Sequence, residues 1–264
     1  MRSLSSKFRR IAMLRERLDG EYVVDCHTHI GGRSSIYHLP DSSTEDMVAE
    51  MDRIGVDLAI TFSFAGITSD YAYGNDVAAE AVRMFPDRFI GFALVNPHYH
   101  TEMDSELERC RQMGLRGIKL ISHYQKYPIE GPGLFPAFEY AHEHSWMILS
   151  HDWGPPEYLD RLAATFNNAC FIVGHYFAPT YAEVVTKREN VYQCTCAALN
   201  FGDVEAMVDS MPADKIVFGS DMPDLPLMFS LAPILFARIS DSDKRKIIGG
   251  TARSMIERWP GNAA

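Results

Sequence analysis

The sequence lacks several features that would mark common classes of protein. No apolar run in its 264 residues approaches the roughly 18–20 residues that span a bilayer, so we expect no membrane association. The formal net charge is −10, whereas nucleic-acid binding depends on cationic surfaces, so we expect no nucleic-acid partner. The five cysteines contain no CxxC pair, which favours a reduced, cytoplasmic chain over a disulfide scaffold.

The length suits one large α/β domain, and no linker or shift in composition divides the chain. We therefore predict a single domain over residues 1–264. Residues 1–20 are rich in arginine and carry a rough helical apolar stripe, which predicts a basic helix before the first strand. We expect this helix to close the bottom of the fold.

Short apolar segments alternate with amphipathic ones along the whole chain. A hydroxyl cap followed by acids at residues 43–46 begins one of the predicted helices, and Gly55 ends it. Eight alternating βα units predict a parallel sheet that closes into a (β/α)8, or TIM, barrel. The predicted strands are residues 22–29, 58–62, 89–95, 117–121, 147–151, 169–174, 191–196 and 215–219.

Two histidines mark the end of the first predicted strand. His27 and His29 are two residues apart, so in a strand their side chains project from the same face. Gly31 and Gly32 follow, which is typical of the mouth of a site. The pair is therefore a candidate for binding one cation.

Other polar residues occur at the ends of later strands. His151 ends the fifth, His175 the sixth, and Asp221 follows the eighth, while Lys119 lies in the fourth. Reactive groups of such barrels lie at the carboxyl ends of the strands, so these residues should meet at one rim. Imidazoles with one carboxylate suit a divalent ion, most often zinc.

Taken together, these segments resemble the amidohydrolase superfamily, and within it amidohydrolase family 2, the mononuclear branch that includes aminocarboxymuconate-semialdehyde decarboxylases. The resemblance spans nearly the whole chain. The matching segments are DCHTH (25–29), RGIKL (116–120), SH (150–151), GH (174–175), GSDMP (219–223) and IGGTARSMI (248–256).

This resemblance implies a distorted (β/α)8 barrel that holds one divalent metal, with zinc first and manganese or iron as alternatives. It implies that the metal ligands are His27, His29, His151 and Asp221, and that His175 contacts the metal-bound water or the substrate. Asp221 and His175 are then the candidate catalytic residues. Many members of the family pair, so a homodimer is also expected.

Several functions fit these residues. The first is hydrolysis of an amide, ester or lactone of a small organic acid by an activated water. The second is non-oxidative decarboxylation of a carboxylated aromatic or unsaturated acid. Hydration of a C=C bond and a binding protein with a structural metal are further alternatives. Lys119 could instead be carboxylated and bridge two metals. Candidate substrate-binding residues are Arg33, Lys119, Trp153 and Tyr176.

Overall fold

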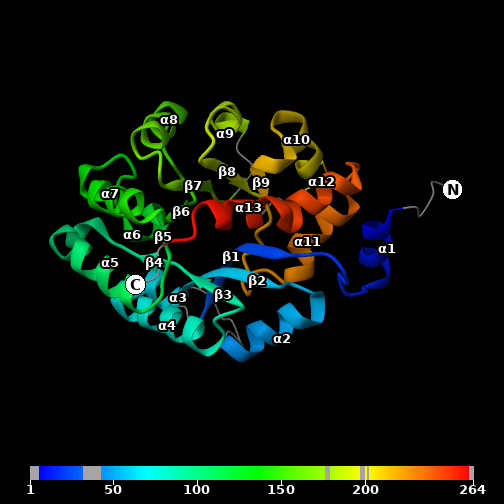
Figure 1. Cartoon of the computed structure of the whole chain (residues 1–264), viewed down its shortest axis with the longest axis horizontal. Helices are drawn as coiled ribbons and strands as arrows, with labels where there is room; N and C mark the ends of the chain where they lie inside the picture. The colour runs from blue at the N-terminus through cyan, green and yellow to red at the C-terminus, as the bar shows by residue number, and fades with distance from the viewer. Residues whose placement is uncertain (1–5, 32–42, 176–178, 197–199, 201, 262–264) are drawn as a thin grey trace.

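A computed structural model describes residues 6–31, 43–175, 179–196, 200 and 202–261 of the chain. Arg33 and Tyr176 lie outside the described residues. Parallel strands form the centre of the molecule and helices surround them, as Figure 1 shows. The prediction of a (β/α)8 barrel is confirmed. Among the described residues, no helix is both long and apolar enough to cross a membrane.

The strands form two hydrogen-bonded sheets that together make the barrel wall, in the orders β1-β2-β3 and β4-β5-β6-β7-β8-β9. Every pair of neighbouring strands is parallel. The strands are β1 (Val24–Ile30), β2 (Leu58–Ser63), β3 (Phe89–Gly91), β4 (Ala93–Leu94), β5 (Gly117–Leu120), β6 (Met147–Ser150), β7 (Cys170–Val173), β8 (Val191–Cys194) and β9 (Ile216–Val217).

Every predicted strand differs by at least one residue from the observed one, and three of these differences matter for the barrel. The first continues through Ile30, so His27 and His29 lie inside β1. The third is interrupted at Phe92 and forms β3, which pairs with β2, and β4, which pairs with β5. The eighth is only the two residues of β9. Short, broken strands make this barrel a distorted one.

Two hydrogen bonds show that the barrel closes between the end of the chain and β1. The Cys26 amide donates to the Phe218 carbonyl at 2.8 Å, and the His29 amide donates to the Met222 carbonyl at 2.7 Å. The segment after β9 therefore runs alongside β1, although about 190 residues separate them in the chain.

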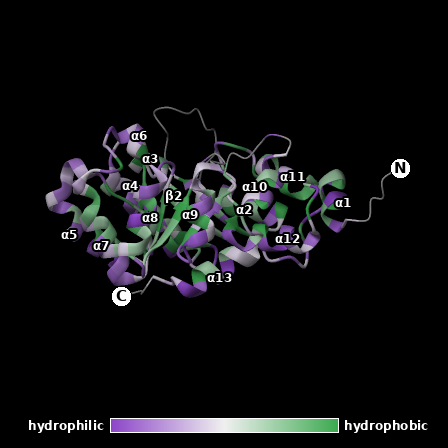
Figure 2. Cartoon of the chain, turned by 90° about the horizontal axis from the view of Figure 1, so that it is seen from above, coloured by the Kyte–Doolittle hydropathy of each residue, from purple (hydrophilic) through white to green (hydrophobic). Residues whose placement is uncertain are grey.

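Helices cover the outside of the wall with their apolar sides inward, and Figure 2 shows hydrophilic residues concentrated on their outer faces. The α-helices are α1 (Lys7–Leu14), α2 (Thr44–Ile54), α3 (Phe64–Thr68), α4 (Tyr71–Met84), α5 (Met103–Gln112), α6 (Ser122–Gln125), α7 (Phe135–His144), α8 (Pro156–Thr165), α9 (Ala182–Lys187), α10 (Asp203–Ser210), α11 (Leu227–Phe236), α12 (Asp241–Arg245) and α13 (Thr251–Arg258).

The predicted limits of one helix are confirmed in detail. The Ser43 hydroxyl accepts a hydrogen bond from the Asp46 amide at 3.1 Å and begins α2. Gly55 ends α2 with φ of 96°, a left-handed conformation that costs glycine little because it has no Cβ.

A helix from the end of the chain closes the bottom of the barrel. Met255 of α13 and Trp259 belong to the apolar cluster inside the barrel, beside Tyr192 at the start of β8. Figure 1 shows α13 crossing the middle of the barrel, whereas α1 lies at the periphery beside α11. The expectation that the N-terminal helix closes the bottom is therefore wrong. α1 instead buries Phe8 and Ile11 in the outer layer.

Candidate metal centre and active site

The two histidines of β1 point into the barrel, as their spacing predicts. Both are buried, and their Nε2 atoms lie near the same oxygen of Asp221: His27 at 3.3 Å and His29 at 3.0 Å from Oδ1. Aromatic rings hold His29 in place. Phe64 stacks on its imidazole with centroids 4.4 Å apart, and Phe62 meets the same ring edge-on at 4.6 Å.

Asp221 reaches these histidines because its backbone is bonded to β1. Its amide donates to the His27 carbonyl at 2.8 Å, and it adopts φ of 68°, a strained conformation for a residue with a Cβ. Gly219 permits this close approach, since a Cβ there would meet the Cβ of His27 at 2.8 Å and Cys194 Sγ at 2.4 Å. The backbone conformation after the eighth strand therefore places the carboxylate of Asp221 beside the histidines.

A buried carboxylate, Asp25, connects the two segments that carry the ligands. Its Oδ1 accepts from the His27 amide at 3.1 Å and from the Ser220 amide at 2.9 Å. Burial raises the pKa of Asp25 to about 7. This residue lies outside the described pocket lining, but it fixes β1 against the loop that bears Asp221.

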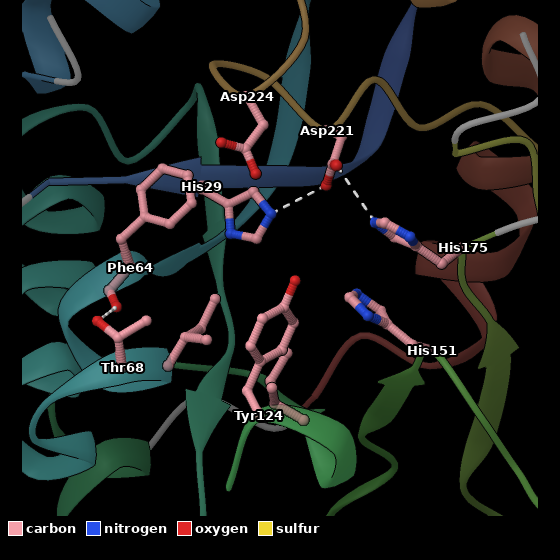
Figure 3. A pocket seen from close by; sticks show the side chains of 10 residues that line it. His29, Phe64, Thr68, Tyr124, His151, His175, Asp221 and Asp224 are labelled. Atoms are coloured by element: carbon pink, nitrogen blue, oxygen red, sulfur yellow. Dashed lines mark hydrogen bonds and ion pairs between the residues drawn. The ribbon is translucent and has the colours of Figure 1, made fainter. Parts of the chain in front are cut away.

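Two more histidines complete the cluster, as Figure 3 shows. His175 has φ of 48°, and its Nε2 lies 3.2 Å from Asp221 Oδ2. The ring of His151 stacks on that of His175 with centroids 4.0 Å apart, and lies 5.3 Å from the ring of His27. The structure therefore brings together all five residues that the sequence predicts for the centre.

The closest donor atoms form two groups in which all atoms lie within 4.8 Å of one another. One contains His27, His175, Cys196 and Asp221, and the other contains His29, Asp221 and Asp224. His151 lies beside them without belonging to either group. Asp221 is common to both groups and is the centre of the cluster.

The electrostatics of the cluster favour a cation. Burial lowers the pKa of His27, His29 and His151, so these imidazoles are neutral and offer lone pairs. Burial would raise the pKa of Asp221, but hydrogen bonds from His175 and His29 outweigh it and hold that pKa well below its usual range. An ionised carboxylate among neutral imidazoles is the donor set of a divalent ion.

Unpaired atoms in the cluster agree with this interpretation. Among the described residues, three buried imidazole nitrogens have no hydrogen-bond partner: His27 Nδ1, His29 Nδ1 and His151 Nε2. Buried polar atoms are nearly always paired, and each exception calls for an explanation. A metal ion would occupy the nitrogen of His151, so the residues fit the group that the resemblance implies.

A small pocket opens on this cluster, with a volume of about 30 Å³. Figure 3 shows Tyr124 and His151 on one side of it and Asp224 beside His29 on the other. The lining residues are His29, Phe64, Ile67, Thr68, Ile121, Tyr124, His151, His175, Asp221 and Asp224.

Sequence reasoning missed Asp224 and Phe64 as pocket residues. Asp224 follows Asp221 by three positions, and its pKa is raised to about 6 by burial and by the charge of Asp221. Phe64 comes directly after β2. A strand-end position was the available signal for both, but neither residue type alone indicates a site.

Two predicted substrate contacts, Trp153 and Lys119, lie outside the described pocket lining. Trp153 is fully buried, and its indole donates to the Ile172 carbonyl at 3.1 Å while packing on Phe171, so it supports the wall and lines no part of the pocket. Lys119 is also fully buried, and its ammonium lies against the metal-binding candidate His27. Its Nζ lies 3.5 Å from His27 Nε2 and 4.7 Å from the Phe62 ring centroid, and burial lowers its pKa to about 7. Carboxylation of Lys119 stays a prediction.

The sequence model of the amidohydrolase family matches residues 24–258. The chain belongs to the amidohydrolase family. The match includes every strand of the barrel and all of the residues placed at the centre.

Curated relatives of this amidohydrolase have two kinds of activity in their names. A 2-amino-3-carboxymuconate-6-semialdehyde decarboxylase from Dictyostelium discoideum is 29% identical over 109 residues, 38% of this chain and 30% of that protein. A 4-sulfomuconolactone hydrolase from Rhizobium radiobacter is 25% identical over 137 residues, 49% of this chain and 42% of that protein. The matches thus span less than half of either relative, and the family is enzymatic with hydrolase and decarboxylase members.

Solved structures share the fold of this amidohydrolase. A dihydroxybenzoic acid decarboxylase from Polaromonas, solved with bound manganese and the inhibitor 2-nitroresorcinol, superposes with a TM-score of 0.71. The two chains are 18% identical, and the alignment covers 90% of this chain and 97% of that one.

Proposed function

We propose that this amidohydrolase is a metal-dependent hydrolase that uses an activated water to cleave an amide, ester or lactone of a small organic acid. One divalent ion, zinc in the first place and manganese or iron otherwise, would be held by His27, His29, His151 and Asp221. One observation carries the proposal: neutral imidazoles surround an ionised carboxylate, and the described pocket lining has two carboxylates but no lysine or arginine.

When bound, the ion supplies Lewis acidity and brings the pKa of a coordinated water to about 7. The chain's own residues then move the proton. Asp221 and His175 are adjacent, with Nε2 and Oδ2 3.2 Å apart, so either can take a proton from the attacking water. The same pair returns that proton to the leaving nitrogen or oxygen as its bond to the carbonyl carbon breaks. Phe64 and Ile67 exclude bulk water on one side of the pocket.

Decarboxylation is the second candidate, and the names of the relatives favour it. In that reaction a proton replaces CO₂ on the substrate carbon, and the substrate brings a carboxylate to the site. A cationic side chain would be expected to hold that carboxylate. Lys119 is buried against His27, and Arg33 lies outside the described residues, so the described lining supports hydrolysis better.

Removal of one ligand tests the metal site. We expect His151→Ala to lose bound metal, measured as metal per chain in protein dialysed after loading with zinc. His100→Ala is the matched control, because His100 is exposed and outside the described pocket lining, and it should keep full occupancy. Full occupancy in folded His151→Ala would reject the ligand assignment.

Product analysis separates the two reactions. The zinc-loaded wild-type protein is given a panel of lactones, esters and amides and a panel of aromatic and unsaturated carboxylic acids. We expect acid release from the first panel and no CO₂ from the second. CO₂ release without acid release would establish the decarboxylase instead.

A further inference from the structure

Asp224 is a second carboxylate in the pocket that the proposed mechanism does not use. It lies on the loop after β9, and Figure 3 shows it beside His29. One of its oxygens lies within 4.8 Å of the donor atoms of His29 and Asp221. The loop is held near Asp221, whose carbonyl accepts from the Leu225 amide at 3.2 Å.

The two carboxylates of the pocket differ in their partners. Asp224 Oδ1 is buried and has no hydrogen-bond partner among the described residues. A carboxylate oxygen buried without a donor is costly, and a second carboxylate nearby increases the cost. Asp221, by contrast, has three imidazoles around it. Asp224 Oδ1 therefore lacks a hydrogen-bond donor, and a donor group on a ligand would supply one.

The space around the cluster is too small for a whole substrate. Its volume of about 30 Å³ has room for roughly two or three water molecules, since each needs about 10–15 Å³ on this measure. An adjoining cavity of about 480 Å³ shares Ile67, Thr68 and Tyr124 with it. The reacting group would enter the small pocket, and the body of the substrate would lie in the larger cavity.

The larger cavity is also acidic and aromatic. Its walls include Asp70 and Glu102, and the rings of Tyr71 and Tyr99 lie 5.7 Å apart. The residues described as lining it include no lysine, arginine or histidine. Tyrosine faces and carboxylates attract amines and hydroxyls and repel anions.

We infer that Asp224 is a substrate-binding residue that accepts a hydrogen bond from an amine or hydroxyl beside the scissile carbonyl, and that the substrates are uncharged or amine-bearing acid derivatives rather than free carboxylates. The inference rests on the proposed function. It adds that the carboxylate appears only on the product, where the acidic walls favour its release.

Hydroxamates test this inference without turnover, because they bind a metal ion in place of a substrate carbonyl. Acetohydroxamic acid and glycine hydroxamic acid differ only by an amino group next to the carbonyl, and succinic acid monohydroxamate carries a carboxylate. Their dissociation constants are measured by calorimetry on zinc-loaded wild-type protein, on Asp224→Asn, and on Asp104→Asn, an exposed control.

We expect wild-type protein and Asp104→Asn to bind the glycine compound at least about 10-fold more tightly than the acetyl compound, as one charge-assisted hydrogen bond would give. In Asp224→Asn this ratio should fall towards one, and the succinyl compound should bind more tightly than it does to wild type. Metal per chain should stay unchanged in the variant.

Three results would overturn the inference. An unchanged ratio in Asp224→Asn would show that Asp224 does not contact the ligand. Loss of metal in that variant would make Asp224 a metal ligand instead. Failure of every hydroxamate to bind metal-loaded protein would show that the pocket admits no such group. Acid release by the wild type is measured separately, so failure of the hydrolase proposal is seen independently of these results.

Discussion

The two ends of the barrel differ in how well their buried groups are paired and packed. At the amino ends, α13 and Trp259 cover an apolar interior, and the nearby carboxylate of Glu21 has two cationic partners, Lys7 and Arg245. At the carboxyl ends, buried ring nitrogens and a carboxylate oxygen of Asp224 have no partner among the described residues.

Two residues of the cluster at the carboxyl ends also have strained backbones. Asp221 and His175, both at the carboxyl ends, hold positive φ angles that residues with a Cβ rarely adopt. The comparison teaches that one end of this fold provides stability and the other holds unsatisfied groups ready for a ligand. If so, substitutions at the two ends should separate stability from metal binding.

The largest effect is expected at the amino end. Trp259 is 2% exposed and packs edge-on against Tyr192 with centroids 6.0 Å apart. Trp259→Ala should lower the free energy of unfolding by about 3–5 kcal/mol, because it leaves a large cavity. Urea unfolding measures this loss. Metal per folded chain should stay at the wild-type level. A selective loss of metal would contradict the proposal that the amino end contributes to stability and not to metal binding.

An intermediate effect is expected from the carboxylate that connects the ligand-bearing segments. Asp25→Ala removes the acceptor of two amides, those of His27 and Ser220, and should weaken metal binding about 10–100-fold, as loss of groups that orient ligands does. Competition with a chromophoric chelator measures the affinity. Asp25→Asn keeps an acceptor oxygen and is the control. Equal affinities for Asp25→Ala and wild type would show that the backbone alone positions the ligands.

The smallest effect is expected at Glu21. Burial raises its pKa, but hydrogen bonds from Lys7 at 2.8 Å and Arg245 at 3.0 Å outweigh burial and lower the pKa below 4.5. The folded state therefore binds fewer protons than the unfolded state, so this stabilisation is present above that value and is lost as the pH falls through the folded pKa.

Glu21→Gln should lower the free energy of unfolding by about 0.5–1 kcal/mol near neutral pH, as exposed or half-exposed ion pairs do. Urea unfolding at several pH values should show the curves of variant and wild type converging in acid. A difference that grows as the pH falls would contradict the sign of the shift. Metal content should not change, because Glu21 lies away from the described pocket lining.

The barrel and most residues of the candidate metal centre follow from the sequence. The alternation of short apolar strands with helices is a local signal, and the end of a parallel strand fixes where its last side chain goes. That is why the strand positions of His27, His29, His151, His175 and Asp221 predict that these residues meet at one rim, whereas their roles as ligands come from the family resemblance.

Tertiary structure decided which neighbours of those residues face the pocket. Trp153 is buried in the wall, Lys119 is buried against His27, and Asp224 lines the pocket, although all three lie in or after strands. Closure of the bottom by α13 also depends on a contact between distant segments. The direction of a side chain at such a position depends on the path of the loop and on the close approach of β1 to the end of the chain. Neither can be predicted from the residues next to that position in the sequence.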